Sequence, residues 1–180
     1  MEKIDKLKKN FTEKKIDGYI VPKNDEFFGE YIPENKDRLK YISNFSGSYG
    51  FALILNNKNY LFIDGRYTLQ AKIQSGNNFL IKTLPKELPE TILKNQTLRI
   101  GFDPQLFTKK ILNIFFSKTN CKFIPINQNL VDKIWFRKNN NKVKKFYTLP
   151  NNSVGQDYKK KIVKIIFEMK KKGADLQFIT

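Results

Sequence analysis

The chain has 180 residues, of which 40% are hydrophobic and 14% aromatic, so it can bury a core and does not resemble a disordered segment. Its formal net charge is +17, and it contains one cysteine and no histidine. These counts exclude a Ser-His-Asp or Cys-His nucleophile pair, a His-ligated metal, a Cys-based zinc site and an internal disulfide.

The first third of the chain predicts a helix, a strand and a second helix. Apolar residues repeat at helical spacing over residues 2–15, and a glycine ends that helix. Residues 19–22 form a short apolar run that predicts a buried strand. Helical spacing returns over residues 34–45. The glycines of residues 47–50 then predict a tight turn before the next strand.

A β-hairpin follows. Two apolar runs, residues 51–55 and 60–63, are joined by four polar residues, which predicts a hairpin. Asp-Gly closes the second run. Residues 66–75 then have helical spacing, and residues 79–84 predict another strand.

Helices and strands alternate from there to residue 136. The predicted order is helix 88–95, strand 98–102, helix 105–118, strand 121–126 and helix 129–136. Cys121 begins an apolar strand, which predicts a buried structural cysteine. This alternation, interrupted by one hairpin, predicts an α/β fold with a mixed β-sheet flanked by helices.

The pattern changes after residue 136. Residues 137–155 are rich in Asn, Pro and Gly and predict a linker. An amphipathic helix is expected over residues 158–172, followed by a strand over 176–179. We therefore expect one domain at 1–136 and, at 156–180, the first elements of a second, similar domain that is incomplete.

Targeting signals are not expected. The chain lacks a run of about 18 apolar residues, and its N-terminal segment is charged throughout, unlike a signal peptide. We expect a cytoplasmic protein that does not bind membranes.

The basic charge allows two interpretations. Attraction of nucleic acid or other acidic partners would make the chain a stand-alone binding module. However, only four of the 34 basic residues are arginines, and Arg is the residue expected where phosphates or base edges are gripped. A lysine-rich and asparagine-rich surface from an AT-rich genome is favoured, and nucleic-acid binding is not expected.

Three acidic residues are candidate general acids or bases: Asp25, Glu30 and Asp64. Each lies near glycines or at a strand end, where a carboxylate commonly caps a turn. A turn or cap role is therefore favoured over catalysis. The sequence predicts no catalytic residue and no metal ligand.

Several motifs in a fixed order then narrow the interpretation. They are DEFFGEYIP, RLKYISNFSGSYGFALI and LFIDGRYTLQA, followed by GFD and NLVDKIW. Together they resemble the creatinase-like N-terminal domain of aminopeptidase P (Xaa-Pro aminopeptidase), most closely the bacterial three-domain form. The resemblance covers nearly the whole chain.

This resemblance implies a layout and a chemistry. Two tandem α/β domains precede a catalytic domain that holds two divalent metals, usually manganese, through Asp, Asp, His, Glu and Glu. None of these ligands can be placed in this chain. We therefore expect an N-terminal fragment, truncated before the catalytic domain and inactive alone. It would help to shape the cleft, form interdomain or homodimer contacts, and pair with a separately encoded catalytic part.

The resemblance also supplies candidate cleft or interface residues. They are Arg66, Tyr67, Asp64, Asp25, Glu30 and Tyr31. Arg66 is one of four arginines, and its guanidinium suits a carboxylate or carbonyl across an interface; pairing with Asp64 is an equally open alternative. Phe27 departs from the family pattern, which commonly has His at that position. If that His has a polar role, the departure favours a degraded gene fragment over a working subunit.

Overall fold

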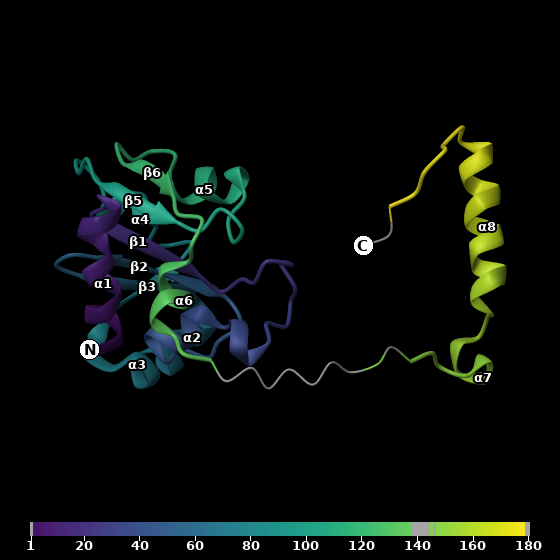
Figure 1. Cartoon of the computed structure of the whole chain (residues 1–180), viewed down its shortest axis with the longest axis horizontal. Helices are drawn as coiled ribbons and strands as arrows, with labels where there is room; N and C mark the ends of the chain where they lie inside the picture. The colour runs from purple at the N-terminus through teal and green to yellow at the C-terminus, as the bar shows by residue number, and fades with distance from the viewer. Residues whose placement is uncertain (1, 138–144, 146, 179–180) are drawn as a thin grey trace. The chain divides into compact units, whose positions relative to one another are not determined.

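The computed structural model describes residues 2–137, 145 and 147–178. Contacts between Cα atoms divide the chain into two units, Met1–Lys138 and Asn139–Thr180. The first unit is a six-stranded sheet with helices on both faces (Figure 1).

The elements of the first unit follow the expected alternation. The strands are β1 (Gly18–Pro22), β2 (Gly50–Leu55), β3 (Asn59–Asp64), β4 (Leu80–Leu84), β5 (Arg99–Phe102) and β6 (Lys122–Pro125). The α-helices are α1 (Glu2–Lys14), α2 (Arg38–Ser43), α3 (Thr68–Ser75), α4 (Pro89–Ile92), α5 (Lys109–Phe116) and α6 (Leu130–Ile134). Short 3-10 helices span η1 (Glu34–Lys36), η2 (Gly65–Tyr67) and η3 (Gly76–Asn78).

The sheet is mixed, as predicted. Its strand order is β4-β3-β2-β1-β5-β6. β2 runs antiparallel to β1 and β3, while the pairs β3–β4, β1–β5 and β5–β6 are parallel. The antiparallel pair β2–β3 is a hairpin, and the antiparallel pair β1–β2 is joined by the segment that contains η1 and α2. Each parallel pair needs a crossover connection, which the helices supply.

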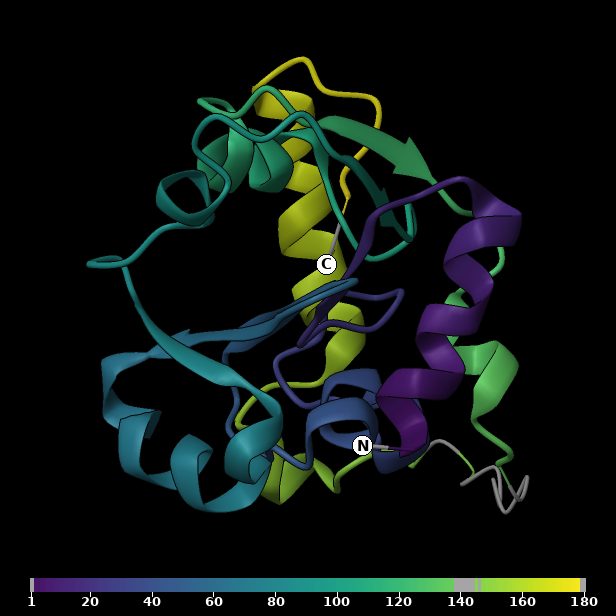
Figure 2. The ribbon, with the colours of Figure 1, turned by 90° about the vertical axis from the view of Figure 1, so that its left-hand side faces the viewer.

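Side chains alternate between two hydrophobic cores. On β1, Tyr19 and Val21 face a core covered by α1, α2, α3 and α6. Ile20 faces the opposite core, which α4 and α5 cover. Figure 2 shows the sheet running between these two groups of helices. Because both faces are buried, the central strands read as continuous apolar runs.

The predicted helix over residues 34–45 is divided. Asp37 separates η1 from α2 and caps α2, because its Oδ1 accepts a hydrogen bond from the Lys40 amide at 3.0 Å. Asn44 ends α2 in the left-handed conformation. The apolar residues at helical spacing, Leu39 and Ile42, both follow Asp37, and an aspartate that caps a helix lies at its start and not inside it.

Two other predicted helices are shorter than expected. The helix expected at 88–95 is limited to α4, and the one expected at 105–118 is limited to α5. Thr108 caps α5 by accepting the Ile111 amide at 3.2 Å. Before this cap, the Leu106 amide bonds to the Asp103 carbonyl in a turn. Leu106 is nevertheless fully buried. Its apolar side chain therefore indicated a buried position and not a helical one.

The second unit contains α7 (Asn151–Val154) and α8 (Tyr158–Lys171). Asp157 caps α8 by accepting the Lys159 amide at 2.8 Å. The strand predicted over residues 176–179 is wrong at 176–178, which are not in a strand, and residue 179 lies outside the described part. Leu176 and Phe178 are exposed there, and a strand requires a partner for its backbone hydrogen bonds.

Among the described residues, no helix combines the length and the apolar character that a membrane crossing requires.

Candidate functional site

An open depression lies at one end of the three inner strands β1, β2 and β3, where β1 and β3 end and β2 begins. Because β2 runs antiparallel to both neighbours, the segments after β1 and β3 meet the turn before β2 at this end. The volume of the depression is about 580 Å³. Its lining residues are Lys23, Asn24, Gly29, Glu30, Tyr31, Ser48, Tyr49, Asp64 and Arg66.

Four of the six candidate residues from the sequence lie in this lining: Glu30, Tyr31, Asp64 and Arg66. The Tyr31 residue is 86% exposed and the Arg66 side chain 74% exposed. Both therefore present atoms to any molecule that enters the depression. Segments that are more than 30 residues apart in sequence are brought to one surface by the strand pairing.

Asp64 and Arg66 form a local ion pair. The Asp64 Oδ1 accepts hydrogen bonds from the Arg66 amide and from Arg66 Nε, both at 2.9 Å. The hydrogen bond from the Arg66 side chain is the largest cause of the lowered pKa of Asp64, and the same pairing raises the pKa of Arg66. The turn after β3 thus holds the exposed guanidinium beside the depression.

Asp25 shapes the loop after β1. The residue is 3% exposed, and its Oδ1 accepts the Phe27 amide at 3.0 Å and the Gly29 amide at 3.4 Å. The Phe28 amide bonds to the Asp25 carbonyl, and Phe28 has a φ of 53°. Asp25 therefore organises the backbone beside Glu30 and is not exposed to a ligand.

Tyr67 borders the depression through Ser48. The two hydroxyl oxygens are 2.8 Å apart. This hydrogen bond is the main reason why the pKa of Tyr67 is lowered from its ordinary value. The contact links the start of α3 to the turn before β2.

Phe27, at the position where the family commonly has His, is 79% exposed. The Lys36 ammonium lies 4.7 Å from the centre of the Phe27 ring, a cation–π arrangement. The ring is not among the residues that line the depression.

Other residues of the lining were not predicted. Lys23 and Asn24 follow β1 directly, and Ser48 and Tyr49 belong to the NFSGSYG motif. A usable signal was the position of Ser48 and Tyr49 between two glycines before a buried strand. Nothing in the sequence distinguishes Lys23 from the other lysines. In the structure its Nζ lies 2.5 Å from Asp37 Oδ2, and both side chains are buried.

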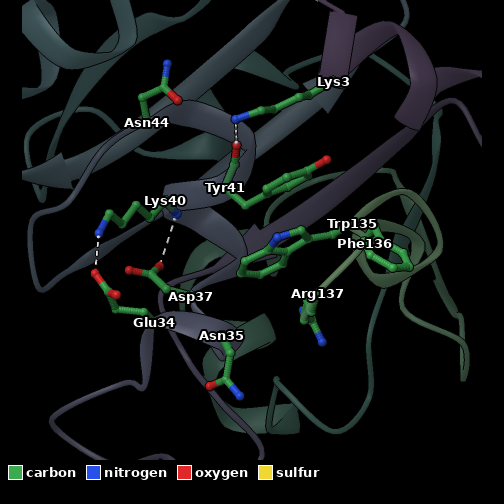
Figure 3. Close-up of a pocket in the computed structure, with 10 residues that line it drawn as sticks. All are labelled: Lys3, Glu34, Asn35, Asp37, Lys40, Tyr41, Asn44, Trp135, Phe136 and Arg137. Carbon is green, nitrogen blue, oxygen red and sulfur yellow. Dashed lines mark hydrogen bonds and ion pairs between the residues drawn. The ribbon is translucent and has the colours of Figure 1, made fainter. Parts of the chain in front are cut away.

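A second hollow, of about 630 Å³, lies beside α2 and the end of α6 (Figure 3). The Tyr41 and Trp135 rings are stacked there, with centroids 4.6 Å apart. The Lys3 ammonium donates to the Tyr41 carbonyl at 2.9 Å, and Lys40 pairs with Glu34 at 3.0 Å. Cations in both hollows have partners inside the domain, so ion pairing does not distinguish them. We regard the first depression as the stronger candidate site because four of the six candidate residues from the sequence line it.

No two-metal site can be built from the described residues. Groups of three or more Cys, Asp or Glu side chains that could hold a metal ion are absent from this part of the chain. Histidine is absent from the whole sequence. The residues present do not fit a pair of divalent metals, so we assign no catalytic step to them.

The family follows from the match of a family model. The model of the Creatinase/Prolidase N-terminal domain matches residues 3–134. The chain belongs to this family. The match covers the sheet and all the helices of the first unit, and with them the depression.

Relatives with longer chains include aminopeptidases. A probable Xaa-Pro aminopeptidase P of Laccaria bicolor is 30% identical over 203 residues, which cover 99% of this chain and 29% of that protein. The chain therefore spans less than a third of the length of this curated relative.

Solved structures agree on the fold. The X-prolyl aminopeptidase of Caenorhabditis elegans, a cytosolic enzyme with a di-nuclear active site, matches with a TM-score of 0.75 and 24% identity, over 97% of this chain and 31% of that chain. The N-terminal domain of the cytoplasmic peptidase PepQ of Mycobacterium tuberculosis matches with a TM-score of 0.57 and 20% identity, over 74% of this chain and 98% of that chain. Neither likeness supports the alternative of a stand-alone basic binding module.

Proposed function

We propose that this chain is the N-terminal, non-catalytic portion of an Xaa-Pro aminopeptidase, a metallopeptidase that releases the residue before a proline. The observation that carries the proposal is the match of 99% of the chain to only 29% of the Laccaria bicolor relative. The whole chain thus corresponds to a minor part of such a protein. The described residues contribute no metal-ligand cluster of their own.

The domain boundaries belong to the same proposal. Residues 1–136 form the creatinase-like domain, 137–155 form a linker and 156–180 begin a second domain of the same type. In support, the family model ends at residue 134 and the first unit ends at Lys138. Residues 138–144 and 146 of the linker lie outside the described part of the chain.

The depression is the surface that we propose faces the catalytic part. Its rim combines an exposed guanidinium with exposed tyrosine rings, and Arg and Tyr are enriched where protein surfaces meet. Arg66 keeps most of its side chain exposed while Asp64 accepts from its Nε at 2.9 Å and from its Nη2 at 3.4 Å, so the other N–H groups of the guanidinium can reach a carboxylate or carbonyl. In this role the domain shapes the mouth of the cleft and contributes no reacting group.

The cofactor and partners follow from the proposal. The two divalent metals, manganese by the family resemblance, belong to the catalytic part, which is encoded separately or as a continuation of this chain. A homodimer, as in the family, is the proposed assembly. The nematode enzyme is described as cytosolic, and we propose a cytoplasmic location here.

The test compares the chain alone with a chimaera. The purified chain should release no N-terminal residue from an X-Pro peptide, with or without manganese. A chimaera, in which the chain replaces the matching segment of the Laccaria bicolor relative, should show metal-dependent release.

Two results would overturn the proposal. One is turnover that follows the purified chain through chromatography. The other is a folded, metal-loaded chimaera that releases nothing. In an active chimaera, Arg66→Ala should reduce release, with Lys58→Ala, on the β2–β3 loop outside the depression, as the matched control.

A further inference from the structure

The loop between β1 and η1 forms one wall of the depression through Asn24, Gly29, Glu30 and Tyr31. It contains neither helix nor strand, so backbone ladders do not hold it. Asp25 stabilises its turn from within the loop. At the start of the loop, Asn24 Nδ2 donates a hydrogen bond to the Leu106 carbonyl at 3.3 Å. A further restraint is needed to fix the turn beyond Asn24, because loop segments with few long-range contacts open at low free-energy cost.

Glu26 provides that restraint. Its Oε1 accepts a hydrogen bond from Arg38 Nη2 at 2.6 Å, and its Oε2 accepts one from Lys36 Nζ at 2.7 Å. Arg38 lies in α2, and its side chain is 4% exposed. A nearly buried guanidinium therefore holds the middle of the loop.

Arg38 is in turn held from the opposite side by α6. Arg38 Nε and Nη2 donate to the two carboxylate oxygens of Asp132, both at 2.8 Å. This fork is specific to the planar guanidinium, and lysine cannot reproduce it. Asp132 also accepts a hydrogen bond from Arg137, so the cluster reaches the end of the first unit.

We propose that Arg38 is the positioning residue of the depression: it couples the 24–31 loop, through Glu26, to Asp132 in α6. A buried guanidinium needs both carboxylates, so a change at either one alters how Arg38 binds the other. Glu26 and Asp132 belong to segments 106 positions apart in sequence, yet share one side chain. The inference concerns the order of the loop; its use for partner binding rests on the proposed function.

A purely structural role for Arg38 predicts a different result. If the cluster only stabilised the fold, loss of Asp132 would raise hydrogen exchange equally throughout the domain. If Arg38 positions the loop, the effect is local, because the loop opens without the sheet. The amides of Phe27 and Gly29, which bond to Asp25, report on the loop, and those of Ala52 and Ile54 in β2 report on the sheet.

The experiment measures amide exchange by NMR in the full chain. Asp132→Asn should speed exchange at Phe27 and Gly29 about tenfold more than at Ala52 and Ile54, the scale of one lost charge-assisted hydrogen bond. Arg66→Ala is the matched control, because it alters the depression without touching the cluster, and it should leave loop exchange unchanged. Equal effects on loop and sheet in Asp132→Asn would overturn the proposal.

A cycle of variants removes the remaining ambiguity. The effects of Glu26→Gln and Asp132→Asn on the free energy of loop opening, measured by amide exchange, should be non-additive when Arg38 is present. The same two effects should be additive in an Arg38→Met background. Additivity in both backgrounds would contradict the coupling. If Asp132→Asn does not fold, Glu26→Gln alone is read at the Val131 amide in α6, where exchange should rise; an unchanged rate there would also overturn the proposal.

Failure here is separable from failure of the proposed function. Suppose that Asp132→Asn speeds amide exchange in the loop, while Arg66→Ala leaves peptide release by the chimaera unchanged. The positioning role of Arg38 would then stand, and the depression would be rejected as the contact surface. The reverse pattern would keep the contact surface and reject Arg38.

Discussion

Replacing Asp37 with Ala should destabilise the first unit strongly. Lys23 Nζ lies 2.5 Å from Asp37 Oδ2, and the two side chains are 8% and 9% exposed. Removing one partner of a buried pair costs about 3–5 kcal/mol, because the other charge stays buried and unpaired. Asp37 also caps α2 through the Lys40 amide, and loss of a cap costs about 1 kcal/mol. The expected loss is therefore about 4–6 kcal/mol, a large part of a typical domain stability of about 5–15 kcal/mol.

Urea unfolding followed by the fluorescence of Trp135, the single tryptophan, measures this loss within the first unit. Asp37→Asn is the matched variant: it keeps the cap but not the charge, so it should be about 1 kcal/mol less damaging than Asp37→Ala. Combining Asp37→Ala with Lys23→Met should recover most of the stability. A loss below about 1 kcal/mol for Asp37→Ala, or no recovery in the double variant, would refute the reasoning.

Three further predictions concern pH and backbone. Burial opposes the charge of Glu26, but hydrogen bonds from a lysine, the backbone and an arginine outweigh it and lower its pKa from 4.5 to about 2. The stabilisation from Glu26, about 1–2 kcal/mol once the shift is discounted for solvent screening of this partly exposed group, should be present above pH 4.5 and lost as the pH falls towards 2, and acid unfolding of Glu26→Gln should lack it. Ser48→Ala should raise the pKa of Tyr67 towards 10, as NMR titration of labelled tyrosine rings can show. Gly50→Ala should cost at least about 3 kcal/mol in urea unfolding, because φ is 149° and the added Cβ would lie 2.4 Å from a β3 carbonyl; Gly76→Ala, with open space around it, should cost about 1 kcal/mol. A Gly50→Ala variant as stable as Gly76→Ala would contradict the steric argument.

Much of the fold was predictable because burial on both faces leaves a strong apolar signal. The runs at 51–55 and 60–63 gave the hairpin, and both strands are almost completely buried. Helix boundaries were less accessible. Asp37 and Thr108 cap helices at positions inside the longer helices predicted at 34–45 and 105–118, and tertiary packing decides which polar residue becomes a cap.

Helix faces were also only partly readable. Leu69 and Ile73 gave α3 its apolar spacing, yet each is 73% exposed, while Ala71 and Ser75 face the core. The close approach of α3 to the sheet favours small residues on its inner face, and a count of large apolar residues misses them.

The part of the candidate site whose residues belong to one motif was predictable from the sequence. The part that strand pairing brings together was not predictable. Asp64 and Arg66 were identified from a three-residue turn, and the turn is stabilised by that pair. The meeting of this turn with Lys23 and Tyr49 depends on register, which sequence periodicity alone does not specify. The link from Arg38 to Asp132 spans 94 positions, beyond the reach of any local pattern.

The central place of β1 has a consequence during synthesis. β1 leaves the ribosome before the other five strands of this sheet, but one of its edges pairs with β2 and the other with β5, where Gly18 lies opposite Ile100. The β2–β3 hairpin can form within microseconds and then accept β1, whereas the other edge of β1 must wait for β5, which lies about 80 positions after β1 in the sequence. Until then the nascent chain exposes an apolar strand edge in the middle of its future sheet. We expect chaperone binding and premature aggregation to concentrate at that edge, rather than at the outer strands β4 and β6.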